Sequence, residues 1–560
     1  MNADARTDVD VVVVGGGPVG LMLACELRLG GARVTVLERL TEVDPTIKAG
    51  SITTPTAEAF YRRGMLPALA EVQEEALRQF RAFRWKQEEN ADPEEADRSR
   101  SEAQAPPPRF AGHFAGIMLR ADRFDDSDPV FRSAGPAGDV GFVSQQEIER
   151  VLAERAELLG VELRRGVELT GFEAGDDGVT VRLARADGGE ALAPLRASWL
   201  VGCDGGRSLV RKLAGFDFPG TPPLITGHQA IVEMTGTEEL KPGWNWTRTG
   251  TYANGPGPRV LTVEFDGPPA DREAPVTAEE LQAGMRAVSG VDVTVTKVHT
   301  ATRFTDNARQ VTDYRAGRVL LAGDAAHVHA PFGGQGLNLG VGDAMNLGWK
   351  LAAVVRGRAP EGLLDSYTAE RHPIGAWVLD WTRAQVALMR PEPHTHALRD
   401  VVAGLTDTTE GTTYLVKRIS GVLQRYDLPG DHELIGRSAP DLEVKALEAD
   451  GGSDGRLAGL LGAGRGLLLD LAGDPALRAR TTGYGDRVDT VTAACPDRPE
   501  LAALLVRPDG ITAWAADADR TDASEAALDA LTEALTRWFG APAQAQAQAP
   551  TPAPATSSSP

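Results

Sequence analysis

A glycine-rich turn close to the start of the chain limits its fold more than any other feature. Residues 11–14 are consecutive valines, as expected of a parallel strand that is buried on both faces. They lead directly into Gly15, Gly17 and Gly20, spaced as GxGxxG, and a helical pattern follows. A second strand pattern covers residues 33–38. This order of strand, turn, helix and strand predicts a Rossmann-type βαβ unit.

The glycines, together with the acidic residue that ends the second strand, predict a dinucleotide site. Gly15 permits the tight turn, Gly17 lets a pyrophosphate approach the backbone, and Gly20 allows close packing of helix on strand. The helix N-terminus offers N–H groups and a partial positive charge to that pyrophosphate. We expect Glu38 to accept hydrogen bonds from an adenosine ribose, and its charge would repel a 2′-phosphate. The turn therefore predicts FAD or NAD rather than NADP.

A second glycine-rich segment decides between these two cofactors. The strand pattern at 318–322 ends in Gly323-Asp324, which places the Asp324 carboxylate to hydrogen-bond a polyol such as a ribityl chain. The run 331–340 brings backbone N–H groups to a ligand at another helix N-terminus. That positive end suits the pyrimidine edge of an isoalloxazine, which gains negative charge on reduction. The two segments together predict FAD.

Composition and charge exclude several other classes of protein. The 560 residues are 42% hydrophobic and 24% charged, which is typical of a globular chain. A formal net charge of -21 disfavours binding to nucleic acid or to anionic membranes. The 3 cysteines have neither CxxC nor metal-ligand spacing, so we expect no metal site. No signal peptide pattern and no apolar run of about 18 residues occur, which predicts a cytoplasmic protein.

The pattern outside these motifs divides the chain into further regions. Residues 85–108 are acidic and polar without apolar periodicity, which predicts an exposed, mobile loop. From 215 to 305, short alternating strands separated by Gly/Pro turns indicate a separate β-rich layer. Strand patterns and a closing helix predict a compact α/β domain over 427–540, and the low-complexity segment 541–560 is expected to be disordered.

Three motifs in this order resemble those of a known family. They are the GxGxxG turn, a Cys203-Asp204-Gly-Gly-Arg207 motif, and the Gly323-Asp324 motif. Their order and separation are similar to those of the FAD-dependent aromatic hydroxylases of the p-hydroxybenzoate hydroxylase type, the class A flavoprotein monooxygenases. The resemblance extends over about residues 8–389.

The segments around the second and third motifs are most similar to one subgroup of that family. This subgroup hydroxylates polycyclic aromatic polyketides in antibiotic biosynthesis and carries a C-terminal thioredoxin-like domain. The resemblance implies an α/β fold with a Rossmann-type FAD-binding domain interleaved with a β-sheet substrate domain, and a thioredoxin-like α/β domain without CxxC. The implied ranges are 1–78, 136–214 and 306–395 for the FAD-binding domain, 79–135 and 215–305 for the substrate-binding middle domain, 396–426 for a helical linker, 427–540 for the thioredoxin-like domain and 541–560 for the tail.

The resemblance also implies roles for individual residues. Lys48 stands where the family usually has an arginine near the flavin, Arg207 is associated with pyridine-nucleotide use, and Pro331 would lie beside the flavin C4a. No general base is assigned. The cofactor-binding residues implied are Gly15, Gly17, Pro18, Val19, Gly20, Glu38, Arg39, Lys48, Gln145, Asp204, Arg207, Asp324, Gly336, Leu337 and Asn338.

The implied mechanism is a two-step redox cycle. NADPH or NADH would reduce FAD without a second Rossmann fingerprint, and reduced flavin would capture O2 as a C4a-hydroperoxide. An electron-rich phenolate would then attack the distal oxygen in a site that excludes water and orients the ring. The expected partner is thus a small aromatic polyketide, with neither nucleic acid nor membrane, and the protein is expected to be a monomer or a homodimer.

Three other functions stay open. A deprotonated flavin peroxide would attack a carbonyl and insert oxygen in a Baeyer–Villiger reaction on the same substrate class. A flavin oxidase or dehydrogenase would place no oxygen in its product. A flavoprotein that serves only in binding or scaffolding would show no substrate-stimulated NAD(P)H oxidation.

The substrate layer contains a few candidate residues. Trp244 and Trp246 would line or cover the substrate, with ordinary strand packing as an equal alternative, and His228 is a further candidate. His327 and His329 have the spacing of a metal pair, but they fall within the flavin motif, which favours a structural role.

Overall fold

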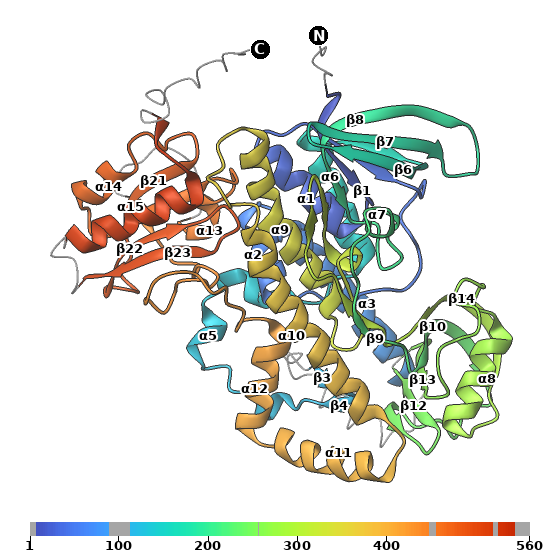
Figure 1. Ribbon diagram of the computed structural model, residues 1–560. Coiled ribbons are helices and arrows are strands. Elements are labelled where there is room, and N and C mark those ends of the chain that lie inside the picture. Colours follow the sequence, from blue (N-terminus) through green and yellow to red (C-terminus); the bar gives the residue numbers. More distant parts are fainter. Residues whose placement is uncertain (1–6, 89–111, 256, 447–454, 519–524, 544–560) are drawn as a thin grey trace.

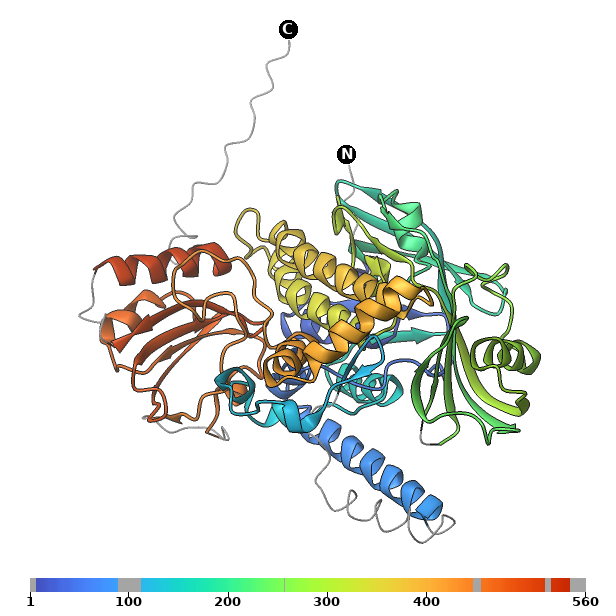
Figure 2. The same ribbon diagram turned by 90° about the horizontal axis from the view of Figure 1, so that it is seen from below.

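A computed structural model of the chain describes residues 7–88, 112–255, 257–446, 455–518 and 525–543. Most of the loop predicted at 85–108 and most of the tail predicted at 541–560 lie outside these ranges. Residues 85–88 form the end of the helix α3 (Leu66–Glu88), which projects from the body of the molecule in Figure 2.

A sheet of 8 strands, the central sheet, lies in the upper right of Figure 1 beside α1 and α6. Its strand order is β16-β17-β8-β1-β2-β5, and β6 and β7 extend it as an antiparallel pair beside β8. The strands β17, β8, β1, β2 and β5 run parallel to one another. Their bounds are β1 (Val9–Val14), β2 (Val34–Glu38), β5 (Glu162–Arg165), β6 (Val167–Gly175), β7 (Gly178–Arg185), β8 (Ala191–Gly202), β16 (Arg315–Ala316) and β17 (Val319–Leu321).

This topology brings the predicted motifs to one edge of the sheet. The glycine turn follows β1, Asp204 follows β8, and Gly323 follows β17. Because these strands are adjacent and parallel, their carboxyl ends open at the same place. The helix α1 (Pro18–Leu29) begins at the glycine turn and packs between the long helix α9 (Gln335–Val355) and α6 (Gln145–Leu158).

A second sheet, in the order β11-β12-β13-β10-β14, lies at one side of the first (Figures 1 and 2). The prediction for 215–305 contained only strands and missed the helix α8 (Ala278–Ser289), which covers this sheet. Thr277 caps α8, since its hydroxyl accepts a hydrogen bond from Glu280 N, and this T-x-x-E pattern was readable in the sequence. The strands are β10 (Thr226–Thr235), β11 (Gly243–Trp246), β12 (Gly250–Asn254), β13 (Arg259–Glu264) and β14 (Thr294–Phe304).

Several smaller elements lie outside the two sheets. They are α2 (Thr54–Arg62), α5 (Pro129–Arg132), the hairpin of β3 (His113–Phe114) and β4 (Ile117–Met118), α7 (Leu209–Leu213), and a three-stranded sheet of β9 (Gly220–Thr221), β15 (Ala308–Gln310) and β18 (His327–Val328).

Three helices continue the chain after α9. They are α10 (Ser366–Met389), α11 (Pro393–Thr406) and α12 (Thr409–Ser420). Within the parts of the chain that are described, no helix is long and apolar enough to cross a membrane.

The C-terminal region forms its own sheet on the opposite side of the molecule from β10–β14 (Figure 1). The strand order is β19-β21-β20-β22-β23, and α15 (Glu525–Phe539) packs against it. The other elements are β19 (Lys445–Ala446), α13 (Leu457–Leu460), β20 (Gly466–Asp470), α14 (Pro475–Arg480), β21 (Val488–Ala494), β22 (Leu501–Val506) and β23 (Thr512–Asp517).

A buried ion cluster joins this C-terminal sheet to α10. The Arg507 guanidinium donates to both carboxylate oxygens of Glu370, at 2.9 and 2.7 Å, and also pairs with Asp509. Lys350 on α9 lies 3.1 Å from Glu370 as well. All four side chains are at most 5% exposed. Although burial opposes it, Arg507 and Lys350 hold the pKa of Glu370 below its ordinary value. Glu370 is therefore ionised, whereas burial lowers the pKa of Lys350 to about 7, so that Arg507 is the main cation of the cluster. Loss of Arg507 leaves buried negative charge without compensation.

We predict that Arg507→Met lowers the free energy of unfolding by about 3–5 kcal/mol, because it leaves Glu370 and Asp509 buried without that cation. Urea unfolding of the whole chain measures this change. The control is Arg182→Met, which removes an exposed ion pair with Glu173 and is expected to cost at most about 1 kcal/mol. Equal losses in the two variants would contradict the prediction.

Candidate active site

A cavity of about 1870 Å³ lies between the carboxyl edge of the central sheet and the β10–β14 sheet. Its wall combines the glycine-rich turns with residues of the second sheet. The predicted site residues that line it are Gly15, Gly17, Pro18, Val19, Glu38, Arg39, Lys48, Gln145, Asp204, Arg207, Trp244, Asp324, Pro331, Gly336 and Leu337. Gly20, His228, Trp246 and Asn338 are not part of this wall.

The glycine turn is shaped by contacts that leave no room for side chains. Gly15 has a φ of 108°, and a Cβ there would stand 2.3 Å from the carbonyl oxygen of Cys203 on the neighbouring strand connection. A Cβ on Gly20 would stand 1.9 Å from the Gly15 oxygen. Gly17 differs, because a Cβ there would meet no atom within 4 Å and would enter the cavity. Gly15 and Gly20 thus allow close packing, and Gly17 keeps the cavity surface open.

Glu38 is held at the cavity by backbone groups on both sides. Its Oε2 accepts a hydrogen bond from Gly16 N at 2.7 Å, and its Oε1 accepts one from Leu40 N at 2.8 Å. Each carboxylate oxygen retains acceptor capacity for a further donor. Arg39 is exposed beside it. The orientation of Glu38 is therefore set by the turn before a ligand arrives.

Asp204 has one satisfied and one unsatisfied oxygen. Its Oδ2 accepts hydrogen bonds from Leu209 N at 2.7 Å and Val210 N at 3.1 Å at the start of α7. Its Oδ1 is buried without a partner. Arg207 is instead exposed and donates to Glu273 at 3.0 Å. A buried carboxylate oxygen that faces a cavity without a donor is a binding feature, since leaving it unpaired is costly.

The third motif forms a turn beside the first turn of α9. Asp324 is exposed to the cavity, and a Cβ on Gly336 would stand 3.8 Å from its Oδ1. The side chain of Asn338 points away from the cavity, where its Oδ1 accepts from Thr53 N at 2.8 Å and its Nδ2 donates to Gly334 O at 2.7 Å. The side chain of Asn338 therefore holds the segments around Thr53 and Gly334 in place. Only its backbone N–H is left for the cofactor-binding role that the sequence predicts.

Lys48 lines the cavity with its charge already paired. Its Nζ lies 2.8 Å from Asp44 Oδ2. Although burial opposes it, this pairing and hydrogen bonds from Thr46 lower the pKa of Asp44 to about 2. A ligand phosphate would therefore have to compete with Asp44 for this ammonium group.

The second-sheet side of the cavity contains residues that the sequence did not single out. His113 packs on Trp244 with ring centroids 4.7 Å apart and ring planes tilted by 49°, and burial lowers the pKa of His113 to about 4. Gly116 N donates to His113 Nδ1 at 3.2 Å, so the neutral ring carries its hydrogen on Nε2. Phe304 and Phe332 pack edge to face on the same wall, with centroids 5.8 Å apart. No local pattern distinguishes these residues, because the fold brings them together from distant segments.

Arg259 is the other residue that the sequence analysis missed. It lies at the start of β13 and lines the cavity, where it stays exposed although desolvation lowers the pKa of its guanidinium. With its amide oxygen turned toward the guanidinium, Gln229 accepts a hydrogen bond from Arg259 Nε at 3.0 Å. Among the described residues, no carboxylate pairs with Arg259. The cavity thus contains a cation without an anionic partner.

The remaining candidates have other surroundings. His228 is buried and lies 2.8 Å from Glu280, which links β10 to α8. Trp246 packs with Trp244 against Gly116, where a Cβ would stand 2.9 Å from both rings. His327 contacts Asp343 at 2.7 Å rather than His329. The described residues contain no group of three or more His, Cys, Asp or Glu side chains that would hold a metal ion.

Comparisons with known proteins agree with this architecture. Residues 8–382 match the family model described as FAD binding domain, and residues 432–542 match the one described as aromatic-ring hydroxylase, C-terminal. The structure of an anhydrotetracycline hydroxylase from Streptomyces rimosus is similar with a TM-score of 0.78 and 39% identity, over 95% of this chain and 99% of that chain.

Two curated relatives show the range of names attached to this architecture. A rifampicin monooxygenase from Streptomyces venezuelae is 40% identical over 542 residues, and a dialkyldecalin synthase from Streptomyces rugosporus is 36% identical over 542 residues. Each alignment covers 95% of this chain and 99% of the relative. The matched FAD-binding region, the full-length similarity and the motifs around one cavity lead to one assignment: the chain belongs to the class A FAD-dependent aromatic hydroxylases and is a flavoprotein monooxygenase.

Proposed function

We propose that this enzyme hydroxylates a polycyclic aromatic polyketide with NADPH or NADH and O2. The observation that carries the proposal is a single cavity that joins the predicted cofactor residues to an aromatic and cationic wall. Its volume of about 1870 Å³ exceeds the 300–1,000 Å³ that is typical of a site for one small ligand. Such a cavity accommodates FAD together with a substrate of several fused rings. Relatives named for anhydrotetracycline and rifampicin support a large substrate.

The cofactor side of the cavity has features that fit FAD. Three buried polar atoms on its wall have no hydrogen-bond partner, namely Thr53 Oγ1, Asp204 Oδ1 and His329 Nε2. Gly17 leaves open space where a pyrophosphate would pass, and Glu38 faces the cavity with its orientation set. We infer that Glu38 holds the adenosine ribose and Asp324 the ribityl chain. Bound FAD would supply the redox chemistry and the activation of O2, and the protein would bind, orient and exclude water.

The substrate side of the cavity favours an electron-rich, ionisable aromatic. Arg259 has no carboxylate partner within the described part of the chain, and an ionised phenol or enol oxygen would supply an anionic one. His113 Nε2–H offers a neutral donor, because the low pKa keeps the ring uncharged at neutral pH. Trp244, Phe304 and Phe332 supply aromatic surface for fused rings. Holding the phenol as phenolate would make its ring carbons more nucleophilic.

We also infer that the C-terminal region has a thioredoxin-like arrangement. Its strands, numbered by order along the chain, lie in the sequence 1-3-2-4-5 across the sheet. The parallel pairing of β20 with β21 and the antiparallel pairing of β22 with β23 support it. The chain has no CxxC, so this region would act in structure rather than in redox transfer. The domain ranges given above, a cytoplasmic location and a monomeric or homodimeric state are part of the proposal.

We predict that Gly17→Ala weakens FAD binding by about tenfold or more, because a Cβ would enter the space needed by the pyrophosphate. Fluorescence titration of apoprotein with FAD measures the affinity. Gly485→Ala is the matched control, since a Cβ there also meets no atom within 4 Å. Both variants should unfold at the same urea concentration as the parent chain. Equal FAD affinities would contradict the role of the turn.

A second prediction concerns the reaction itself. Aerobic NADPH oxidation by the FAD-loaded protein should increase when a tetracyclic aromatic polyketide such as anhydrotetracycline is added. Under isotopically labelled O2 the product should carry one labelled oxygen and keep its ring sizes. A product in which one ring is enlarged to a lactone would indicate Baeyer–Villiger insertion instead of hydroxylation. Formation of hydrogen peroxide alone with every aromatic tried would favour an oxidase, and substrate conversion without oxygen uptake would contradict a monooxygenase.

We further predict that Arg259→Met raises KM for that substrate by about tenfold to a hundredfold, the loss expected for a hydrogen bond to a charged group. The FAD affinity should stay unchanged, and Arg259→Lys should restore part of the lost binding. Arg248→Met is the control, because Arg248 is exposed and does not line the cavity. A KM that is equal in the Arg259 and Arg248 variants would remove Arg259 from the substrate site.

A further inference from the structure

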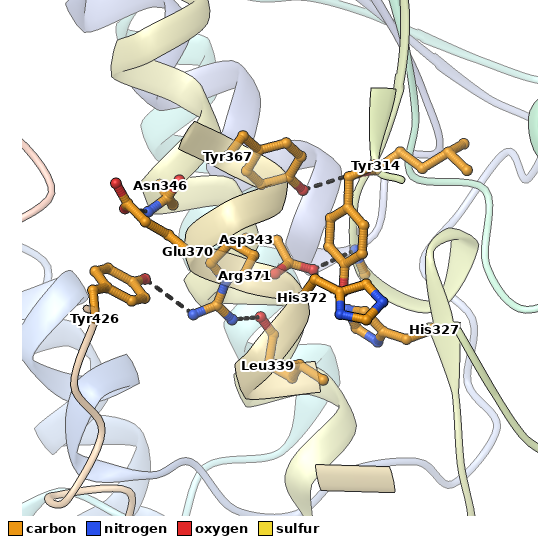
Figure 3. Close-up of polar contacts among 12 residues, drawn as sticks. Tyr314, His327, Leu339, Asp343, Asn346, Tyr367, Glu370, Arg371, His372 and Tyr426 are labelled. Atoms are coloured by element: carbon orange, nitrogen blue, oxygen red, sulfur yellow. Dashed lines mark hydrogen bonds and ion pairs between the residues drawn. The ribbon is translucent and has the colours of Figure 1, made fainter. Parts of the chain in front are cut away.

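A chain of buried hydrogen bonds connects Gly323 through Asp343 and Arg371 to Tyr426, which precedes the C-terminal sheet. Figure 3 shows Asp343, Arg371 and Tyr426 side by side. We propose that Asp343 positions the Gly323-Asp324 turn for FAD, and that Arg371 and Tyr426 hold Asp343 in place, so that the segment entering the C-terminal region sets the affinity for FAD. The proposal rests on the role given to Asp324 above and does not depend on the identity of the aromatic substrate.

Asp343 on α9 is the centre of this chain. It is 0% exposed, and its Oδ2 accepts hydrogen bonds from Gly323 N at 3.0 Å and from His327 Nε2 at 2.7 Å. Its Oδ1 accepts one from Arg371 Nε at 2.7 Å. Although burial opposes it, Arg371 and His327 lower the pKa of Asp343. The ionised carboxylate therefore holds both ends of the turn that contains Asp324.

The turn needs such support because its own backbone is unusual. Gly323 has a φ of 63°, in the left-handed region. The 3-10 turn η3 (Gly323–Ala325) then directs Asp324 into the cavity. No hydrogen bond from another described side chain fixes the Asp324 carboxylate. Its position is thus decided by the backbone on either side, and a displacement of about 1 Å would be felt at a bound ligand.

Arg371 on α10 connects Asp343 to the next segment. Its Nη2 donates to Leu339 O at 2.8 Å, and its Nη1 donates to the hydroxyl of Tyr426 at 3.0 Å. A Cβ on Gly342 would stand 2.7 Å from this guanidinium, so the glycine leaves the space that Arg371 occupies. Figure 3 shows the guanidinium between Tyr426 and α9. Each of the three guanidinium nitrogens of Arg371 thus donates to a defined acceptor.

Tyr426 belongs to the segment that enters the C-terminal region. Its backbone N donates to Gly436 O at 2.8 Å, and Gly436 N donates to Thr512 O on β23 at 2.9 Å. Its ring packs in one apolar cluster with Trp514 and Trp538. The C-terminal sheet therefore fixes the position of the Tyr426 hydroxyl. Through its hydrogen bond to Arg371, this hydroxyl helps to hold Asp343 in place.

The test uses FAD titration of the full-length apoprotein, with urea unfolding of the same apoprotein in parallel. Tyr426→Phe keeps the ring and removes only the hydroxyl, and we expect it to weaken FAD binding by about threefold to tenfold. The amide of Asp343→Asn has one acceptor oxygen and cannot accept hydrogen bonds at both positions as the carboxylate does. We expect this variant to weaken FAD binding by about tenfold or more. The visible circular dichroism of bound flavin should change in both variants, since the isoalloxazine would be held differently.

The matched control is Arg63→Met. Arg63 is equally buried, pairs with Glu26 at 2.6 Å and donates to Leu461 O and Pro508 O, but it does not contact the chain through Asp343. It should lower the unfolding free energy without changing FAD affinity or the flavin dichroism. If Arg63→Met weakens FAD binding as much as Tyr426→Phe, general loosening of the fold explains both and the proposal fails.

A double variant tests the connection itself. If the effect of Tyr426 passes through Asp343, Tyr426→Phe should weaken FAD binding no further in the Asp343→Asn background. Full additivity of the two effects would overturn the chain of contacts. If Asp343→Asn does not fold, the comparison of Tyr426→Phe with Arg63→Met decides alone. FAD affinities within twofold of the parent in Tyr426→Phe would overturn the role of the C-terminal region while leaving the proposed hydroxylation untouched.

Discussion

The close approach of three strand ends is the constraint on which the rest of the structure depends. The connections that follow β1 and β8 lie so near each other that a Cβ on Gly15 would overlap the Cys203 carbonyl. At the third connection, a Cβ on Gly340 would stand 2.5 Å from Val19 and 3.1 Å from the Gly323 Cα. Glycine is needed here because two backbones and a helix meet, and the result is a rim of backbone groups around one cavity. The second sheet then closes that cavity from the other side.

Burial of charge is the second recurring feature, and it occurs where separate parts of the chain must stay in register. Asp343 with Arg371 and Glu370 with Arg507 are each almost fully buried, and each has several hydrogen-bond partners. Such groups contribute little net stability compared with apolar packing, but they are costly to separate. They therefore favour one arrangement of α9, α10 and the C-terminal sheet over slightly shifted ones. The Gly323-Asp324 turn lies at the end of this arrangement.

Local patterns in the sequence were sufficient for much of the fold. The valine run and the GxGxxG turn both correspond to observed elements, because each depends on residues a few positions apart. The helix α8 was missed because its flanking Gly/Pro turns suggested only strands, although Thr277 and Glu280 form a readable cap.

The sequence by itself determined the cofactor motifs, their order and the family. The glycine spacing reflects a local steric requirement, which can be recognised without knowing the fold. The tertiary structure alone decided which residues line the cavity opposite the glycine-rich turns and which ones hold the Gly323-Asp324 turn. Arg259 and His113 come from segments far apart in the chain. The roles proposed for them follow from the lack of a carboxylate partner for Arg259 among the described residues and from the burial that lowers the pKa of His113. Asp343 likewise gains its role only from Gly323, His327 and Arg371, which reach it from three different elements. Burial and partner choice are properties of the folded neighbourhood, and no pattern along the chain encodes them in readable form.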